Sequence, residues 1–168
     1  MTTMPKSLFA PLQVSTTPDP MVLEYLQGGS VAKNDAQEAA LAKLRRDVVS
    51  KPVIYLGMGT CGMGAGVAKV EKAVREYLDA HHKDVEIVEV GCIGMCAFEP
   101  MLDVQMPGKR RLSFMQVSPE NVAGILDGVF AGKVPTANLV GQFRAGPAEA
   151  WADLPYVDEH SFFKPQLR

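Results

Sequence analysis

The stretch PVIYLGMGTCGMGAG at residues 52–66 joins a short apolar run to a glycine-rich segment that contains a cysteine. The apolar run at 53–56 is β-branched and aromatic and ends at a glycine, which predicts a buried strand. The residues VAKVEKAVREYLDAHH at 67–82 carry valines at helical spacing with charges on the opposite face, which predicts an amphipathic helix. A second β-branched run, VEIVEV at 85–90, predicts another strand. Together these elements predict a parallel strand-helix-strand unit with a right-handed crossover.

The chain continues with a predicted hairpin and a closing helix. The runs MLDVQ at 101–105 and LSFMQV at 112–117 flank a proline-glycine pair, which is typical of a tight turn. The sequence SPE at 118–120 is typical of a helix start, and apolar residues then repeat at helical spacing. The order β-α-β, loop, β-hairpin and α over residues 52–132 predicts a thioredoxin-like α/β domain.

Four segments are expected along the chain. Residues 1–34 are rich in proline and show no sustained period, which predicts an irregular N-terminal arm. The helix formers of DAQEAALAKLRRDVV predict a helix at 35–50, before the α/β domain at 51–133. Residues 134–168 mix prolines and glycines with scattered aromatic side chains. Because such a segment cannot form a core of its own, we expect an extended C-terminal arm that docks on a partner.

Length and composition exclude several classes of protein. The 168 residues, 47% of them hydrophobic, suffice for one domain with a real core. A net charge of -2 and a pI near 5.9 give no concentration of Lys and Arg for nucleic acid. The apolar stretches are shorter than the roughly 18 residues that cross a bilayer. The start MTTMPKSLFAPLQ also lacks the pattern of a signal peptide. We therefore expect a cytoplasmic protein without a nucleic-acid partner or membrane insertion.

The three cysteines are the candidate functional residues. An odd number, with two cysteines four positions apart, argues against a secreted disulfide framework. Cys61 lies at the start of the first helix, and Cys92 and Cys96 lie in the loop after the second strand. Because the carboxyl ends of neighbouring parallel strands meet at one edge of a sheet, we expect the three sulfurs to converge. Glycines in both loops let backbone amides approach the sulfurs, which favours a metal or iron-sulfur cluster site with these three ligands.

Other interpretations of the same loops stay open. The simplest is that the cysteines are small buried side chains. A dithiol redox pair is disfavoured, because such pairs in this fold have two intervening residues, whereas Cys92 and Cys96 have three. A zinc ion needs a fourth ligand, and His81 and His82 lie at the far end of the predicted helix. The spacing GMGTCG resembles a nucleotide fingerprint, but Glu89, the candidate acid, lies farther along the chain than such a site requires.

Three stretches carry a resemblance to a known family over roughly residues 50–168. They are LGMGTCGMGAGV at 56–67, VGCIGMCAFEPMLDVQMPGKRRLSF at 90–114 and VSPENVAGILDGVFAGKVP at 117–135. They resemble the thioredoxin-like 2Fe-2S ferredoxin domain found at the N-terminus of NADH-binding flavoprotein subunits. Such subunits occur in complex I, NAD-linked hydrogenases, formate dehydrogenases and electron-bifurcating enzymes. The resemblance implies a thioredoxin-like ferredoxin domain separated from its flavin module, with no flavin or NAD on this chain.

The resemblance also implies a ligand set. The family places two cysteines in the first loop and two in the second. Cys61, Cys92 and Cys96 match three of these positions, and Gly57 stands at the position of the first cysteine. The resemblance therefore implies a 2Fe-2S cluster whose fourth ligand is Glu99, a water or a group of a partner chain. The alternative is a domain that has lost the cluster and serves a structural role.

Two further sequence features lie near these loops. Pro100 occupies the place where thioredoxin-like folds commonly keep a cis-proline. Lys109, Arg110 and Arg111 at the hairpin tip are expected to form a solvated turn, with contact to an acidic partner as the alternative.

The functional expectation is a non-catalytic, accessory electron-transfer subunit of a multi-subunit NADH-linked oxidoreductase. It relays electrons through a 2Fe-2S cluster to or from an NADH-binding flavoprotein subunit, alongside other redox subunits. The alternative is a cluster-free structural subunit that scaffolds the flavoprotein, with Trp151, Phe162 and Phe163 as docking side chains. An independent thiol oxidoreductase or zinc protein is a third interpretation.

Overall fold

The computed structural model describes residues 35–144 and 146–166. The expected N-terminal arm at 1–34 lies outside these residues. The chain divides into two compact units, Met1–Leu41 and Ala42–Arg168, and the boundary falls within helix α2 (Asp35–Leu44). The sheet, its helices and the cysteines all belong to the second unit.

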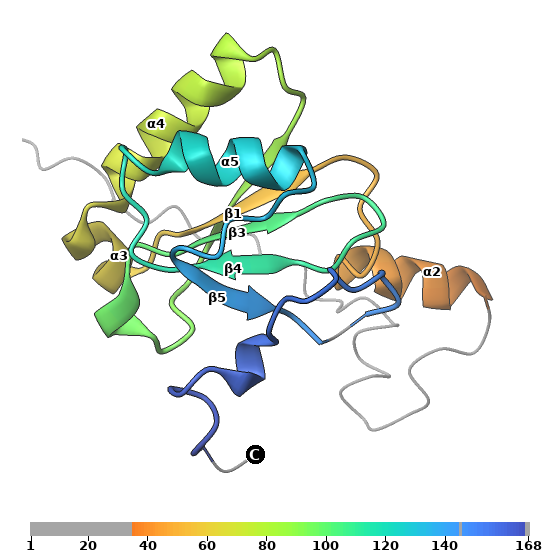
Figure 1. Cartoon of the computed structure of the whole chain (residues 1–168). Helices are drawn as coiled ribbons and strands as arrows, with labels where there is room; N and C mark the ends of the chain where they lie inside the picture. Colours follow the sequence, from red (N-terminus) through yellow and green to blue (C-terminus); the bar gives the residue numbers. More distant parts are fainter. Residues whose placement is uncertain (1–34, 145, 167–168) are drawn as a thin grey trace, which may run out of the picture. The chain divides into compact units, whose positions relative to one another are not determined.

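The second unit is built on a five-stranded sheet with the strand order β2-β1-β3-β4-β5 (Figure 1). Strands β1 and β2 are parallel, whereas β3 pairs antiparallel with β1, β4 with β3 and β5 with β4. The order and directions of the first four strands are those of a thioredoxin-like sheet, so the predicted fold class is confirmed. The strands are β1 (Val53–Gly57), β2 (Glu86–Val90), β3 (Leu102–Gln105), β4 (Leu112–Phe114) and β5 (Leu139–Gln142).

Helices α4 (Val67–Ala80) and α5 (Val122–Phe130) lie on the same side of this sheet (Figure 1). Alternate residues of the central strands pack against them, as the two-residue period of a strand requires. The remaining side chains of the same strands point to the opposite face. Removal of the aliphatic side chains from water stabilises this layer by roughly 25 cal/mol per Å². The buried residues of the helix-facing layer include Ile54, Leu56, Leu102, Val104, Leu112, Phe114, Val70, Val74, Ile125 and Leu126.

The described residues of 134–168 differ from the extended arm that their composition predicts. Strand β5 joins the sheet, and a short 3-10 helix, η2 (Val157–Glu159), follows it. Val140 and Val157 are buried in a second cluster with Met95 and Met101, and Phe162 packs against it. The free edge of β4 supplies the backbone partners that this segment cannot supply itself, and such a long-range pairing leaves no mark on local composition. Docking of the segment on a partner stays a prediction.

Two helix boundaries also differ clearly from the prediction. The helix predicted over 35–50 ends at Leu44, because Arg46 adopts a positive φ of 55° and the N–H of Asp47 donates to the carbonyl of Ala42. The last helix begins at Val122 rather than at 118, since a side-chain turn closes residues 118–121 first.

The glycine-rich stretch after β1, predicted as a loop, contains an additional helix, α3 (Thr60–Ala65). It ends at Gly66, whose φ of 97° separates it from α4. A substitution at this glycine is strained whatever the space around it.

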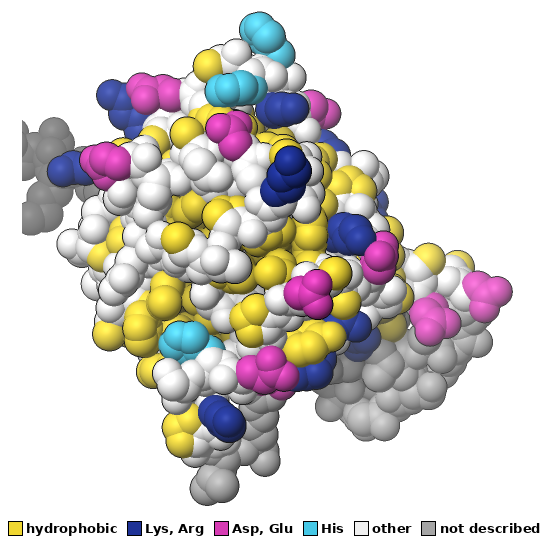
Figure 2. Space-filling model, viewed as in Figure 1, with side chains coloured by type: hydrophobic (Ala, Val, Ile, Leu, Met, Phe, Trp, Pro, Cys, Tyr) yellow, Lys and Arg dark blue, Asp and Glu magenta, His cyan; other side chains and the backbone are white. Residues whose placement is uncertain are grey.

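Two surface properties bear on the expected function classes. No helix among the residues described is long and apolar enough to cross a membrane. Acidic and basic side chains are interspersed over the face shown in Figure 2. That face therefore carries no continuous basic area of the kind that follows a nucleic-acid backbone.

Candidate functional site: a three-cysteine cluster

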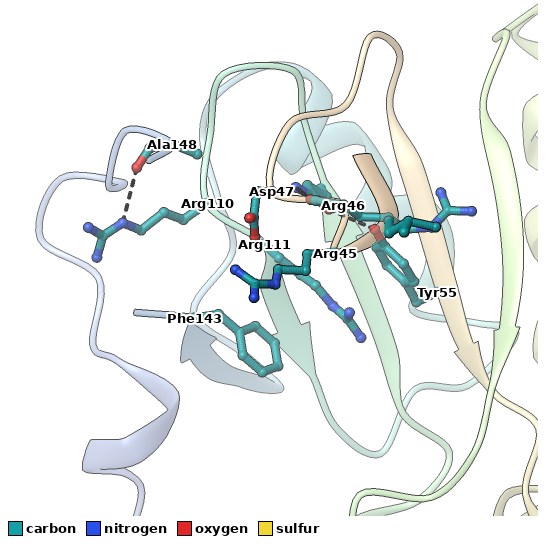
Figure 3. Close-up of a pocket in the computed structure, with 10 residues that line it drawn as sticks. Arg45, Arg46, Asp47, Tyr55, Arg110, Arg111, Phe143 and Ala148 are labelled. Atoms are coloured by element: carbon teal, nitrogen blue, oxygen red, sulfur yellow. Dashed lines mark hydrogen bonds between the residues drawn. The ribbon is translucent and has the colours of Figure 1, made fainter. Parts of the chain in front are cut away.

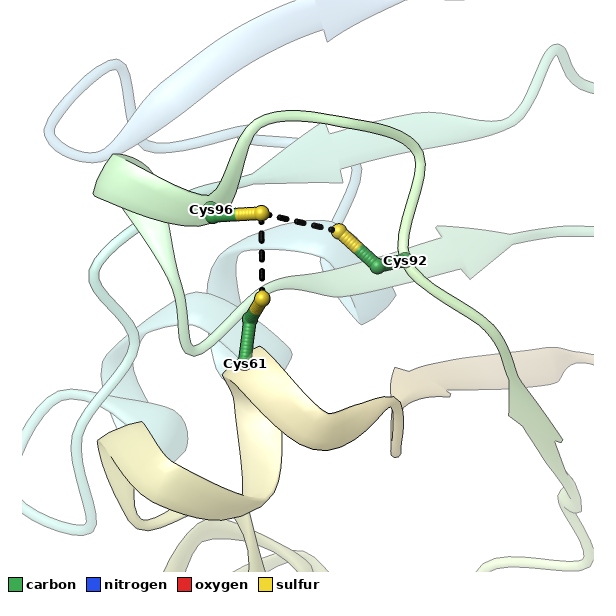
Figure 4. A group of neighbouring side chains, drawn as sticks. All are labelled: Cys61, Cys92 and Cys96. Atoms are coloured by element: carbon green, nitrogen blue, oxygen red, sulfur yellow. Dashed lines mark hydrogen bonds between the residues drawn. The ribbon is translucent and has the colours of Figure 1, made fainter.

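The three sulfurs converge as expected (Figure 4). Cys61 lies in helix α3, Cys92 in the loop after β2, and Cys96 opens a 3-10 helix, η1 (Cys96–Phe98). The Sγ of Cys96 is 3.0 Å from that of Cys61 and 3.5 Å from that of Cys92. All three sulfurs lie within 4.8 Å of one another, at the edge where β1 and β2 end. Their role as ligands stays a prediction.

Glycines allow the two loops to approach this closely. A Cβ at Gly59 would lie 3.0 Å from the backbone nitrogen of Cys92. A Cβ at Gly62 would lie 1.9 Å from the carbonyl oxygen of Gly57, which no side chain tolerates. Gly62 therefore fixes the turn from β1 into α3 that presents Cys61, and Gly59 lets the Cys92 loop lie against it.

Backbone amide donation to sulfur is observed at one cysteine. The N–H of Gly94 donates to the Sγ of Cys92 over 3.3 Å, and the positive φ of 93° at Gly94 turns the amide toward it. Such a bond stabilises a thiolate and raises the reduction potential of a group that the sulfur ligates. Cys92 and Cys96 are exposed and Cys61 is partly so, whereas Met95 between the last two is fully buried and anchors their loop.

The donor set fits an iron-sulfur cluster in kind. Three thiolates are soft ligands of the type that iron-sulfur clusters and zinc select. A single tetrahedral ion with bonds of about 2.3 Å holds its sulfurs about 3.8 Å apart. Two of the observed separations, 3.0 Å and 3.5 Å, are shorter than that, and all three lie within 4.8 Å. The chain has three cysteines, one fewer than the four protein ligands of a typical 2Fe-2S cluster.

Glu99, a candidate fourth ligand, is not gathered with the sulfurs. The described residues form one group of three or more His, Cys, Asp or Glu side chains with metal-ligand spacing, and Glu99 is outside it. Its carboxylate is buried, accepts the N–H of Met101 over 2.8 Å, and lies beside Gly57. The peptide bond between Glu99 and Pro100 is cis, at the position where the resemblance implies a cis-proline. His81, weighed above as a zinc ligand, is outside this group as well, and its ring stacks on Tyr77 at the end of α4.

Buried polar side chains also lie along the opposite face of the sheet, and the sequence analysis does not predict them. The hydroxyl of Tyr55 donates to Gln105 over 2.7 Å, and the Nε of Arg111 donates to Asp103 over 2.8 Å. The guanidinium of Arg111 lies 3.8 Å from the centre of the Tyr55 ring. Burial raises the pKa of Tyr55 and also that of Asp103, although the positive charge of Arg111 opposes both shifts. A polar residue at an alternate strand position normally indicates a solvated face, so the sequence gives no signal of this burial.

Comparison with protein-family models gives no match, and neither does comparison with curated protein sequences. Among solved structures, a thioredoxin-like 2Fe-2S ferredoxin from Aquifex aeolicus is 17% identical with a TM-score of 0.47. The match covers 60% of this chain and 100% of that one. A second structure of that ferredoxin is 18% identical with a TM-score of 0.42, over 52% of this chain and 93% of that one. A cysteine-to-serine variant of that ferredoxin is 19% identical with a TM-score of 0.45, and the match covers 52% of this chain and 95% of that one. The fold assignment rests on the strand order described above.

Proposed function

We propose that this chain is an accessory electron-transfer subunit of a cytoplasmic, multi-subunit NADH-linked oxidoreductase. In this proposal it holds a 2Fe-2S cluster and exchanges electrons with an NADH-binding flavoprotein subunit, which carries the flavin and the NAD site. The observation that supports it most directly is the gathering of three sulfurs within 4.8 Å at one edge of a thioredoxin-like sheet. Thiolates presented by glycine-rich loops are the usual protein ligands of such clusters.

The proposal gives each residue of the site a specific role in binding the cluster. Cys61, Cys92 and Cys96 would hold the cluster, which supplies one-electron transfer when bound. The N–H of Gly94 donates to the Sγ of Cys92 and stabilises negative charge on it. Buried Met95 fixes the loop between the two cysteines, so that their sulfurs stay in place.

The surface around the sulfurs suits contact with a redox partner. Two large apolar side chains next to the cysteines in sequence are unusually exposed, Met63 at 51% and Ile93 at 47%. Apolar side chains beside exposed sulfurs favour an interface over a fully solvated surface. A partner that covers them also excludes water from the site and shortens the path to its own redox group.

The test is electron transfer from NADH through a partner. The full chain is loaded anaerobically with iron and sulfide and mixed with an NADH-oxidising flavoprotein from the same organism. We expect NADH to bleach the visible absorption of the chain only when the flavoprotein is present. Cys92→Ser should abolish the absorption, whereas Met63→Ala should keep it and slow the bleaching.

A colourless chain that still binds the flavoprotein would contradict the relay. That outcome would establish instead the cluster-free scaffold, in which the C-terminal aromatic side chains make the contact. Absorption that NADH never bleaches in the mixture would exclude the flavoprotein as the electron donor.

A further inference from the structure

A pocket of about 190 Å³ lies on the opposite face of the sheet from α4 and α5 (Figure 3). Among the described residues, four arginines line it together with a single acidic residue, Asp47. This concentration is notable in a chain whose net charge is -2. The arginines come from two Arg-Arg pairs far apart in the sequence, and the remaining lining mixes aromatic, polar and aliphatic residues. The arginines are Arg45, Arg46, Arg110 and Arg111.

Two of these arginines make contacts with other parts of the chain, away from the centre of the pocket. Arg46 pairs with Glu86 over 2.8 Å, and Arg110 donates to the carbonyl of Ala148 over 3.2 Å. Figure 3 shows both side chains extending away on opposite sides. Arg110 has no carboxylate partner among the residues described, so its positive charge still contributes to the field in the pocket.

The other two arginines occupy the middle of the lining (Figure 3). Arg111 is fixed between the rings of Tyr55 and Phe143, at 3.8 Å and 5.0 Å, and uses its Nε and one terminal nitrogen on Asp103. The other terminal nitrogen of Arg111, Nη1, does not take part in the ion pair with Asp103, so its N–H groups can donate to a ligand. Arg45 has no hydrogen bond or ion pair within the described part of the chain, and it is exposed at the mouth.

A second hollow of about 350 Å³ adjoins the first and shares Asp47, Gln105 and Ala148 with it. Its other lining residues include Val48, Val49, Gly108, Lys109 and Glu149. The first hollow is smaller than the few hundred Å³ typical of a whole-ligand site, so it suits a single charged group, with the remainder of a molecule in the second.

We infer that this pocket binds the phosphate group of a small phosphate ester. Arg45 and Arg111 donate to the phosphate oxygens, since planar guanidinium groups match a phosphate with two parallel hydrogen bonds. The stacking of Arg111 on Tyr55 and its bond to Asp103 hold it in place before binding, which lowers the entropy cost. The inference goes beyond the proposed relay and does not depend on the cysteines.

Calorimetric titration of the full chain at low ionic strength tests the inference. The probes are ribose 5-phosphate, inorganic phosphate, citrate and uncharged ribose. We expect both phosphates to bind and the ester to bind more tightly, while ribose gives no heat. Arg45→Ala should weaken binding about tenfold or more, the loss expected for one charge-assisted contact. Because Arg45 has no partner among the described residues, this variant should keep the wild-type melting temperature.

The matched control is Arg75→Ala, which removes an arginine paired with Glu71 on α4, outside the pocket. It should leave binding unchanged. No heat from either phosphate would overturn the inference, as would equal losses in the two variants, which would mean diffuse attraction to positive charge. Tighter binding of citrate than of either phosphate would assign the pocket to carboxylates instead.

Discussion

The carboxylate of Glu99 fills the space next to Gly57. A Cβ built at Gly57 would lie 3.1 Å from the Oε2 of Glu99, and that oxygen accepts the N–H of Met101. Gly57 and the buried carboxylate beside it are therefore parts of one local arrangement. A fourth thiolate at 57 needs the space that Glu99 takes.

The first prediction concerns the addition of a fourth thiolate at position 57. In the double variant Gly57→Cys/Glu99→Ala we expect the loaded chain to lose iron to a chelator several times more slowly than wild type, because four thiolates seal a cluster better than three. Gly57→Cys alone should gain less, since its side chain meets the Glu99 carboxylate. Loss rates followed by visible absorption check this. Equal rates for the double variant and wild type would show that position 57 does not face the cluster.

The second prediction concerns the turn that presents Cys61. Gly62→Ala places a Cβ 1.9 Å from the carbonyl oxygen of Gly57 and should destabilise the chain by about 3 kcal/mol, the range of an overpacked site. Gly64 lies in the same helix with nothing within 4 Å of its Cβ position. Gly64→Ala should therefore stabilise by about 0.5 kcal/mol, because alanine is the better helix former. Urea denaturation measures both, and a similar effect for the two variants would refute the packing argument.

The third prediction separates a buried ion pair from an exposed one. Asp103→Ala leaves Arg111 without its carboxylate between two aromatic rings, and should cost about 3 kcal/mol. The matched change Glu71→Ala breaks an i,i+4 pair with Arg75 on the surface of α4, and should cost about 0.5 kcal/mol or less. Chemical denaturation of both variants provides the comparison. Costs of equal size would mean that the sheet-face pair is effectively solvated.

The fourth prediction is a loss of stability in strong alkali. Burial and the hydrogen bond from its hydroxyl to Asp127 raise the pKa of Tyr77 to about 12. An unfolded tyrosine ionises near pH 10, so the folded state holds its proton longer. This contribution is complete below about pH 10 and is lost as the pH rises toward 12. Unfolding measured across that window should show the decline, and Tyr77→Phe should flatten it. An unchanged slope in the variant would assign the decline to other groups.

Much of the fold follows from local sequence patterns. The β-branched runs predict β1 and β2, the helical spacing of valines predicts α4, and the proline-glycine pair predicts the hairpin of β3 and β4. The convergence of the cysteines follows from topology alone, because both loops leave the same ends of parallel neighbours. These features depend on residues close together in sequence or on a general rule of chain connection.

The remaining features depend on contacts between distant segments. Strand β5 forms because β4 offers an edge, and α3 forms in a glycine-rich stretch whose own helix propensity is low. Asp103 is buried because Arg111 covers it, and Arg45 reaches the pocket because its helix ends early. Each of these outcomes is set by tertiary packing, which overrides the local preference of the residues involved.

Iron and acid-labile sulfide content tests the central claim most directly. The full chain is purified anaerobically, and the same analysis is applied to Cys61→Ser, Cys92→Ser and Cys96→Ser. The account predicts about two irons and two sulfides per wild-type chain, visible bands that bleach on reduction, and loss of both elements in each variant. Wild-type protein without iron or sulfide, before and after anaerobic loading, would contradict the account, and the three converging cysteines would then serve packing alone.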